Sequence, residues 1–505
     1  MTIKNVNEPH LILGYIFLLF LSMGCESKKT EILWNKSLYV IGSQSSPRTS
    51  DLNGDGVLDL VMGAGKNEFQ HCEQGVLAIN GSNGEVIWQQ ESDDQVFASP
   101  TFYDINQDDV NDVFIGGRSP QLKALDGKTG DIIWSYDYRE FSHDPILQHA
   151  RFNFYNCSLI PDQNEDGLDD LLVLNGGNPN AEPHSVSDRY PGVLMLVDSR
   201  SGNIIAADTM PDGAESYMSP LFIDQKNSNK QFVVFGSGGE TLSGSLFIIE
   251  LQEFKKNGLK KSVRIAEESG HGFIAPPVAA DINGDGYYDI IAISHASTAI
   301  AIDGRSFAPI WENKIKNTES SNAFAVGYFN EDEIPDFFTF VSYGIWPEST
   351  GSLQVLLDGI SGEIIYENTL GCSGFSSPVV FDLNNDGWEE AIISINEYDC
   401  TRGYVDSTDL QIENKLVAID FKNNSINQID VTPNFKNIFS TPWIGDLDED
   451  GYLDIVHCQY YSPSNDLMQF LGMNIKRIST GIKISQRPIW GAYMGADGDG
   501  IFKVK

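Results

Sequence analysis

The chain has 505 residues, of which 41% are hydrophobic, so it can bury a large core and does not have the composition of a disordered protein. Its 71 acidic residues outnumber its 33 basic ones and give a formal net charge of −38. This excludes nucleic acid as an expected partner, because phosphate binding needs basic patches. Short runs of Ile, Val, Phe and Tyr between Gly- and Asn-containing turns predict an all-β protein.

The N-terminus predicts export. Lys4 precedes the apolar run LILGYIFLLFLSM, which is short for a transmembrane helix and typical of a signal peptide. We predict a signal peptide over residues 1–24 and a short tether over 25–30. The stretch LSMGC resembles a bacterial lipoprotein signal, which implies that Cys25 carries a lipid and holds the protein, outside the cytoplasm, on the cell envelope at the outer membrane or cell surface. An ordinary secretory signal is the alternative.

Residues 31–505 are predicted to form one domain, because an acidic nonapeptide recurs through them. Six copies resemble DxNxDGxxD, and they start at Asp51, Asp104, Asp162, Asp281, Asp382 and Asp446. Two decayed copies start at Tyr328 and Asp224. Consecutive copies are about 47 to 64 residues apart, which is the length of one blade of a β-propeller.

The flanks of these loops repeat as well. Six of the eight copies have a proline four residues before the first loop position, and each loop is followed by a short apolar run. Many units then carry a hairpin signature, such as VLAINGSNGEVIW at 76–88. Four strands per unit and eight units predict an eight-bladed propeller, with seven blades as the alternative.

The two ends of the chain are predicted to meet in the last blade. After the loop at 446 no hairpin ends in Trp, whereas ILW at 32–34 matches the end of the hairpin signature. We therefore expect the N-terminal strand to complete the last blade, and residues 485–505 to pack on that junction. Five cysteines follow Cys25, so at least one thiol stays unpaired within the chain; Cys372 and Cys400 flank one repeat and could pair.

The acidic loops have the pattern of calcium sites. Side chains at positions 1, 3, 5 and 9 can direct oxygens to one centre, and glycine at position 6 permits the positive φ of a sharp turn. An EF-hand is excluded, because position 12 is not Glu (it is Met62 in the first copy) and strands flank the loops. The predicted calcium ligands are Asp51, Asn53, Asp55, Asp59, Asp104, Asn106, Asp108, Asp112, Asp162, Asn164, Asp166, Asp170, Asp281, Asn283, Asp285, Asp289, Asp382, Asn384, Asp386, Glu390, Asp446, Asp448, Asp450 and Asp454.

These loops resemble FG-GAP (integrin α-like) repeats, and hairpins such as ALDGKTGDIIW resemble the quinoprotein (PQQ-type) propeller repeat. The first resemblance implies that calcium has a structural role in the loops. Trp88, Trp134 and Trp311 recur at one repeat position, which indicates packing between blades. The adjacent cysteine pair of many quinoprotein dehydrogenases is absent, so a quinone-dependent oxidoreductase is disfavoured.

Polar and aromatic insertions at 137–156, 178–191 and around 397–409 are the candidate functional segments. They supply a possible ligand surface of His143, His149, Arg151, His184, Arg189 and Tyr190. The favoured function is a calcium-stabilised, lipid-anchored propeller that binds a protein or a glycan without catalysis. The alternatives are a carbohydrate-active enzyme resembling rhamnogalacturonan lyases, and an assembly factor resembling the propeller subunit of the outer-membrane barrel-assembly machinery. No nucleophile and base stand at a spacing that decides for an enzyme.

Overall fold

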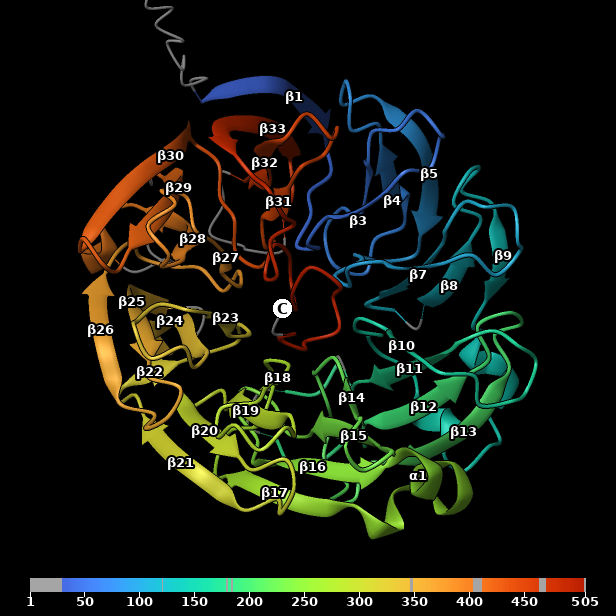
Figure 1. The fold of residues 1–505 in the computed structure, drawn as a ribbon. Helices are drawn as coiled ribbons and strands as arrows, with labels where there is room; N and C mark the ends of the chain where they lie inside the picture. Colours follow the sequence, from blue (N-terminus) through green and yellow to red (C-terminus); the bar gives the residue numbers. More distant parts are fainter. Residues whose placement is uncertain are drawn as a thin grey trace, which may run out of the picture.

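Eight β-sheets surround one central axis (Figure 1). The computed structural model describes residues 30–119, 121–178, 180–182, 185–345, 348–402, 411–462 and 469–503. The prediction of an all-β, eight-bladed propeller is confirmed, and the seven-bladed alternative is wrong. Residues 1–29, which include the predicted signal peptide and Cys25, lie outside the described residues. Among the described helices, none combines the length and the apolar character needed to cross a membrane.

Each blade has four antiparallel strands, called a to d here from the axis outward. Blades 1 and 2 consist of β2 (Arg48–Ser50), β3 (Asp59–Gly63), β4 (Cys72–Ile79) and β5 (Val86–Ser92), and of β6 (Thr101–Tyr103), β7 (Asp112–Gly117), β8 (Gln121–Leu125) and β9 (Ile132–Ser135). Blades 3 and 4 consist of β10 (Ser158–Ile160), β11 (Asp170–Asn175), β12 (Val193–Val197) and β13 (Ile204–Thr209), and of β14 (Leu221–Gln225), β15 (Lys230–Gly236), β16 (Gly244–Glu250) and β17 (Val263–Glu268).

Blade 5 consists of β18 (Val278–Ala280), β19 (Asp289–Ile293), β20 (Thr298–Ile302) and β21 (Pro309–Lys314). Blade 6 has β23 (Ala325–Gly327), β24 (Asp336–Ile345), β25 (Glu348–Leu357) and β26 (Ile364–Thr369), with the short β22 (Thr318–Glu319) also paired to β24. Blade 7 has β27 (Val379–Phe381), β28 (Glu390–Glu397), β29 (Glu413–Asp420) and β30 (Ser425–Pro433), and blade 8 has β31 (Trp443–Gly445), β32 (Tyr452–Tyr461), β33 (Gly472–Lys483) and β1 (Glu31–Tyr39). The helices are short: η1 (Tyr138–Phe141), η2 (Leu147–His149), α1 (Leu251–Asn257), η3 (Gly258–Lys261) and η4 (Cys400–Arg402).

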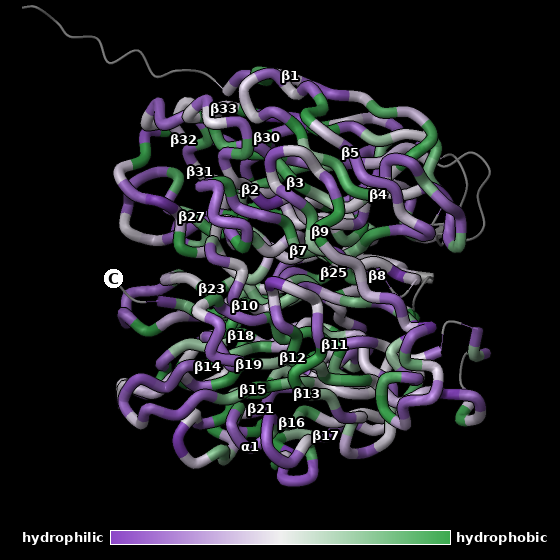
Figure 2. Tube along the Cα trace, turned by 90° about the vertical axis from the view of Figure 1, so that its right-hand side faces the viewer, coloured by the Kyte–Doolittle hydropathy of each residue, from purple (hydrophilic) through white to green (hydrophobic). Residues whose placement is uncertain are grey.

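The burial of each strand follows its place in the blade. Strands b, such as β3 and β19, are buried along their whole length, because neighbouring sheets cover both of their faces. Strands d, such as β26, alternate between more and less exposed residues because only one face is covered. The hydrophobic core therefore lies between the sheets, and hydrophilic residues are frequent in the turns at the periphery of the side view (Figure 2).

Tryptophans at the end of the hairpin motif join neighbouring blades. The Nε1–H group of Trp88 on β5 donates to the carbonyl of Gly127 in the next blade at 2.7 Å. Trp34, Trp134 and Trp311 donate in the same way to Gly81, Ser199 and Gly359. The predicted packing role of these residues is confirmed.

The N-terminal strand closes the ring. Strand β1 pairs with β33 from Glu31 to Tyr39, with one irregularity after Ile32. Trp34 on this strand reaches the carbonyl of Gly81 in blade 1 at 2.8 Å, so it links the last blade to the first. The motif ILW therefore performs the same role here as IIW and VIW perform inside the chain.

The C-terminal segment fills the centre of the ring (Figure 1). It forms β-bridges from Trp490 to Val380 of blade 7 and from Ile501 to Ala279 of blade 5. The segment contacts the junction of the chain ends, where Ile444 of blade 8 donates to the carbonyl of Gly491 and Arg48 of blade 1 donates to that of Tyr493. It also extends along the axis, where Trp490 and Phe502 bury their rings against inner strands.

The cysteines divide into one disulfide and three buried thiols among the described residues. Cys372 and Cys400 form a disulfide, as their positions around one repeat suggested. The thiols of Cys72, Cys157 and Cys458 are buried. The disulfide ties the start of blade 7 to the segment after β28.

Candidate functional site

The two faces of the propeller carry different features. In an antiparallel four-stranded blade, the a–b and c–d turns lie at one end, and the b–c and d–a connections lie at the other. All acidic loops are a–b turns, so they share the first face with the c–d hairpin turns. The insertions at 137–156 and 178–191 are d–a and b–c connections, so they lie on the opposite face.

The first positions of each acidic loop fold the loop on itself. In the copy at 281–289, the carboxylate of Asp281 accepts hydrogen bonds from the backbone N–H groups of Gly284 and Gly286 at 2.8 and 2.9 Å. The side-chain oxygen of Asn283 accepts from the backbone of Asp285 at 3.0 Å. Gly286 has a φ of 82°, as the prediction for position 6 requires.

In four of the described loops, the carboxylate at position 9 joins the loop to the hairpin of its own blade. Asp289 is fully buried, and it accepts hydrogen bonds from the N–H groups of Ile282 in the loop and Gly304 in the c–d turn. Burial raises the pKa of Asp289 to about 6. Asp59, Asp112 and Asp336 bond the glycines of their own hairpin turns in the same way.

Two loops bring three carboxylates within reach of one ion. Single oxygens of Asp446, Asp448 and Asp450 lie within 4.8 Å of one another, and so do oxygens of Asp332, Asp336 and Asp358. Such spacing fits a calcium ion that takes oxygens at about 2.3–2.6 Å. The second group includes a decayed copy, and its Asp358 comes from a hairpin turn that the loop motif does not contain.

The loop at 446 and the copy at 224 have neighbours that set them apart. Arg477 donates to Asp454 at 2.7 Å and pairs with Asp448 at 2.6 Å, so a buried cation already faces the loop at 446. The copy at Asp224 is no acidic loop, because Asp224 belongs to strand β14 and a tight turn follows. Gln225 instead bonds the backbone of Tyr288 in the next blade twice, at 2.8 and 2.9 Å.

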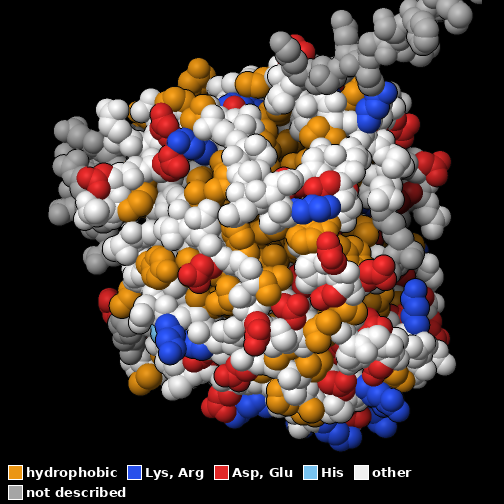
Figure 3. Space-filling model, turned by 60° about the vertical axis from the view of Figure 1, so that its left-hand side comes forward, with side chains coloured by type: hydrophobic (Ala, Val, Ile, Leu, Met, Phe, Trp, Pro, Cys, Tyr) orange, Lys and Arg blue, Asp and Glu red, His pale blue; other side chains and the backbone are white. Residues whose placement is uncertain are grey.

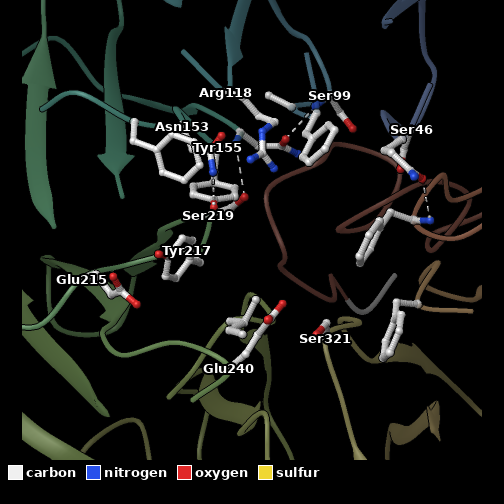
Figure 4. A pocket seen from close by; sticks show the side chains of 18 of the residues that line it. Ser46, Ser99, Arg118, Asn153, Tyr155, Glu215, Tyr217, Ser219, Glu240 and Ser321 are labelled. Carbon is white, nitrogen blue, oxygen red and sulfur yellow. Dashed lines mark hydrogen bonds between the residues drawn. The ribbon is translucent and has the colours of Figure 1, made fainter. Parts of the chain in front are cut away.

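A cavity of about 380 Å³ lies on the face opposite the acidic loops (Figure 4). Its wall combines aromatic rings, side-chain amides and paired charges from several blades, and Tyr493 of the C-terminal segment lines it as well. The main lining residues are Phe97, Arg118, Phe152, Asn153, Tyr155, Asn156, Arg189, Glu215, Tyr217, Glu240, Ser321, Phe375 and Phe439.

Two arginines in the cavity wall are held by carboxylates. Nη1 of Arg189 donates to both carboxylate oxygens of Glu215, at 2.8 and 2.9 Å, and Glu215 is 2% exposed. Arg118 pairs with Glu68 at 2.7 Å, and its guanidinium lies 5.1 Å from the ring centre of Phe152. Both cations are thus fixed in position before a ligand arrives.

Three further side chains give the cavity hydrogen-bonding groups. Tyr155 and Tyr217 lie edge to face at 6.5 Å (Figure 4). Burial raises the pKa of both phenols far above the ordinary value, so each keeps its proton to donate. Glu240 is exposed and lines the cavity, and desolvation by the surrounding protein raises the pKa of its carboxyl group.

The predicted ligand surface only partly coincides with this cavity. Arg189 lines it, whereas His149 and Arg151 contact the ring of Tyr190, at centroid distances of 5.9 and 5.8 Å, without lining it. His143 is exposed, and His184 lies outside the described residues.

Sequence reasoning missed most of the cavity. Arg118, Glu215, Tyr217 and Glu240 lie in ordinary blade connections rather than in long insertions. The sequence could have indicated these residues only through their positions, because they lie between strands b and c or between strands d and a.

Comparison with known proteins places the chain among propellers of one family. The family model described as FAM234A/B beta-propeller matches residues 64–380. Human protein FAM234B is 20% identical over 398 residues, which are 72% of this chain and 58% of the human protein. Chicken FAM234B is 22% identical over 375 residues, which are 68% of this chain and 56% of that protein. The chain therefore spans less than two thirds of the length of these relatives.

Solved structures share the fold at low sequence identity. Quinohemoprotein alcohol dehydrogenase from Comamonas testosteroni superposes with a TM-score of 0.55 and 11% identity, covering 91% of this chain and 78% of the enzyme. A europium-containing methanol dehydrogenase gives a TM-score of 0.56 and 9% identity, covering 89% of this chain and 93% of that enzyme. At such identities, the likeness concerns the fold alone.

Proposed function

This chain belongs to the FAM234A/B β-propeller family, and we propose that it is a binding module whose cavity takes a polar ligand with an apolar face, a glycan by preference. The observation that carries this proposal is the composition of the cavity wall. Aromatic rings supply flat apolar surfaces, while amides, phenols and fixed charges supply directional hydrogen bonds. A saccharide presents both kinds of surface.

A binding experiment tests the proposal. The protein is applied to an array of neutral and acidic saccharides, and hits are measured by calorimetry. Tyr217→Ala should weaken binding about tenfold or more, because it removes an aromatic wall of the cavity. Tyr39→Ala is the control, since Tyr39 is 79% exposed on β1. Absence of any saccharide binding, or equal binding by the Tyr217 variant, would contradict the proposal.

One observation favours the enzyme alternative: desolvation raises the pKa of Glu240, which lines the cavity, and a raised pKa favours the protonated carboxyl group that can act as an acid. Incubation with acidic polysaccharides would distinguish the two functions. An unsaturated product that disappears in Glu240→Gln would favour a lyase over a pure binding module.

The proposal also includes structural calcium in the acidic loops and a lipid anchor at Cys25. The convergence of Asp332, Asp336 and Asp358 supports calcium. The disulfide Cys372–Cys400 supports a compartment outside the cytoplasm. The anchor is supported by the stretch LSMGC alone, and acyl labelling that persists in Cys25→Ala would rule it out.

A further inference from the structure

We propose that His271, His295 and Glu319 form a transition-metal site beside the cavity, with Zn²⁺ as the best-fitting ion. One ligand atom from each residue lies within 4.8 Å of the other two. This site differs from the acidic loops in its chemistry and in its place on the opposite face. It stands on its own geometry and does not depend on a glycan ligand.

Three separate connections bring these residues together. His271 lies between β17 and β18, His295 lies in the turn between β19 and β20, and Glu319 lies on β22. All three belong to d–a or b–c connections, which are on the cavity face. Ser321, two residues after Glu319, lines the cavity, and so does Glu240, whose backbone contacts His271 (Figure 4).

Backbone carbonyls fix the tautomers of both histidines. The Nδ1 atom of His271 lies 2.6 Å from the carbonyl oxygen of Glu240, and Nδ1 of His295 lies 3.0 Å from that of Ser320. A carbonyl can only accept a hydrogen bond, so each Nδ1 carries the proton. In the neutral ring each Nε2 then has a lone pair, which is the arrangement of metal-binding histidines whose other nitrogen donates to an outer partner.

The Nε2 atom of His295 is buried without a hydrogen bond. His295 is 1% exposed, and its Nε2 has no hydrogen-bond partner among the described residues. It lies 3.5 Å from Oε2 of Glu319. A buried polar atom without a partner is costly, and a cation between the nitrogen and the carboxylate removes that cost.

The 3.5 Å separation itself fits zinc. Tetrahedral Zn²⁺ with ligands at about 2.0–2.2 Å separates neighbouring ligand atoms by about 3.3–3.6 Å. Two imidazoles and one carboxylate are a zinc donor set, whereas calcium takes six to eight oxygens. Three protein ligands leave a fourth position for water or for an oxygen of a ligand in the cavity.

Metal titration tests the site. The full chain is stripped of metal, supplied with excess Ca²⁺ to fill the acidic loops, and titrated with Zn²⁺ by calorimetry and with Co²⁺ by visible absorption. We expect one saturable site, with the intense absorption of tetrahedral Co²⁺. Glu319→Gln and His271→Gln should each weaken Zn²⁺ binding by about tenfold to a hundredfold or more. His149→Gln, which alters a histidine outside the cluster, should bind as the unchanged protein does.

Each other outcome overturns the proposal. Absence of saturable Zn²⁺ binding would show that no metal joins His295 and Glu319, and an affinity unchanged in both variants would place the metal at another site. Binding that His149→Gln also removes would place the metal elsewhere. Because His271 is only partly buried, its variant tests the site even if substitutions at His295 prevent folding.

Discussion

His457 is a fully buried histidine on β32 that makes stability depend on pH. Its Nε2 lies 3.1 Å from the hydroxyl of Ser394, and its Nδ1 lies 3.3 Å from the amide of Gln459. Burial lowers the pKa of His457 from 6.5 to about 4; Asp430 opposes this effect and Lys476 adds to it. The neutral ring is therefore favoured in the folded state, and the unfolded chain binds the extra proton between these two pH values.

We predict that the free energy of unfolding falls as pH decreases from about 6.5 to 4, by about 3 kcal/mol from this group alone. Urea unfolding at pH 7 and pH 4.5 measures the fall. His457→Gln should reduce the difference between the two pH values, whereas His71→Gln, at a half-exposed side chain, should leave it unchanged. Equal pH dependence in the His457 variant would contradict the assignment.

Gly167 stands at position 6 of its acidic loop, where the need for a positive φ can be tested separately from side-chain contacts. Its φ is 88°, and a methyl group placed there would meet no atom within 4 Å. Gly167→Ala should therefore lower the free energy of unfolding by about 1–2 kcal/mol through conformation alone. Gly351→Ala is the matched control, since Gly351 lies in strand β25 with ordinary contacts and no positive φ. Equal midpoints in urea for both variants would refute the backbone explanation.

At the scale of elements, one contact repeats around the ring: a tryptophan of one blade packs on the hairpin turn of the next. Trp88 covers Gly130, where a Cβ atom would lie 2.7 Å from the indole ring. Trp88→Phe keeps a ring but removes the hydrogen bond to Gly127, so we expect a loss of about 1–2 kcal/mol. Gly130→Ala should cost more, because the turn must move away. Chemical unfolding measures both losses of stability. Trp388→Phe serves as the control, because Trp388 lies in an acidic loop, where Lys422 lies over its ring.

We predict that bound calcium stabilises the acidic loops. Each filled site should add about 2–3 kcal/mol when the free ion is at a hundred times its Kd. Thermal unfolding with Ca²⁺ and with chelator measures the effect. Asp281→Asn should lower the midpoint in Ca²⁺ more than in chelator, because in chelator it loses only one of the two hydrogen bonds that the carboxylate accepts from Gly284 and Gly286. An equal loss in both solutions would show that Asp281 acts only through these hydrogen bonds.

At the scale of the whole molecule, the repeated parts of the fold could be predicted and the cavity could not. Each blade needs the same loop, buried strand and Trp-ended hairpin, so these features recur in the sequence and their count indicates eight blades. The cavity wall has no such repeat, because each blade contributes a different side chain from positions as distant as Gln44 and Tyr493. Arg189 was found because it lies in a long insertion, whereas Glu240 and His295 lie in short connections. The path of the C-terminal segment depends on the space left at the axis, which no local pattern encodes.

The surface of the whole molecule carries the acidic excess as scattered charges. Figure 3 shows Asp and Glu side chains spread over one side, with fewer Lys and Arg between them. A net charge of −38 opposes the compact state through self-repulsion, and salt should weaken that repulsion. Measurements of calcium and ring-closure effects therefore need one fixed ionic strength.

Closure of the ring by β1 should determine the stability of the entire propeller. Without β1, strand β33 becomes an unpaired edge, and the contact from Trp34 to blade 1 is lost. We predict that a chain beginning at residue 41 loses a large part of the roughly 5–15 kcal/mol that holds a folded protein together, and that it self-associates through the exposed edge. Urea unfolding and size-exclusion chromatography measure the two effects. A chain beginning at residue 30 keeps β1 and should behave as the full chain does, and Trp34→Phe should lie between the two. Equal stability of the chains that begin at 30 and 41 would show that the ring holds without its N-terminal strand, because the axial C-terminal segment and the other interblade contacts would then suffice.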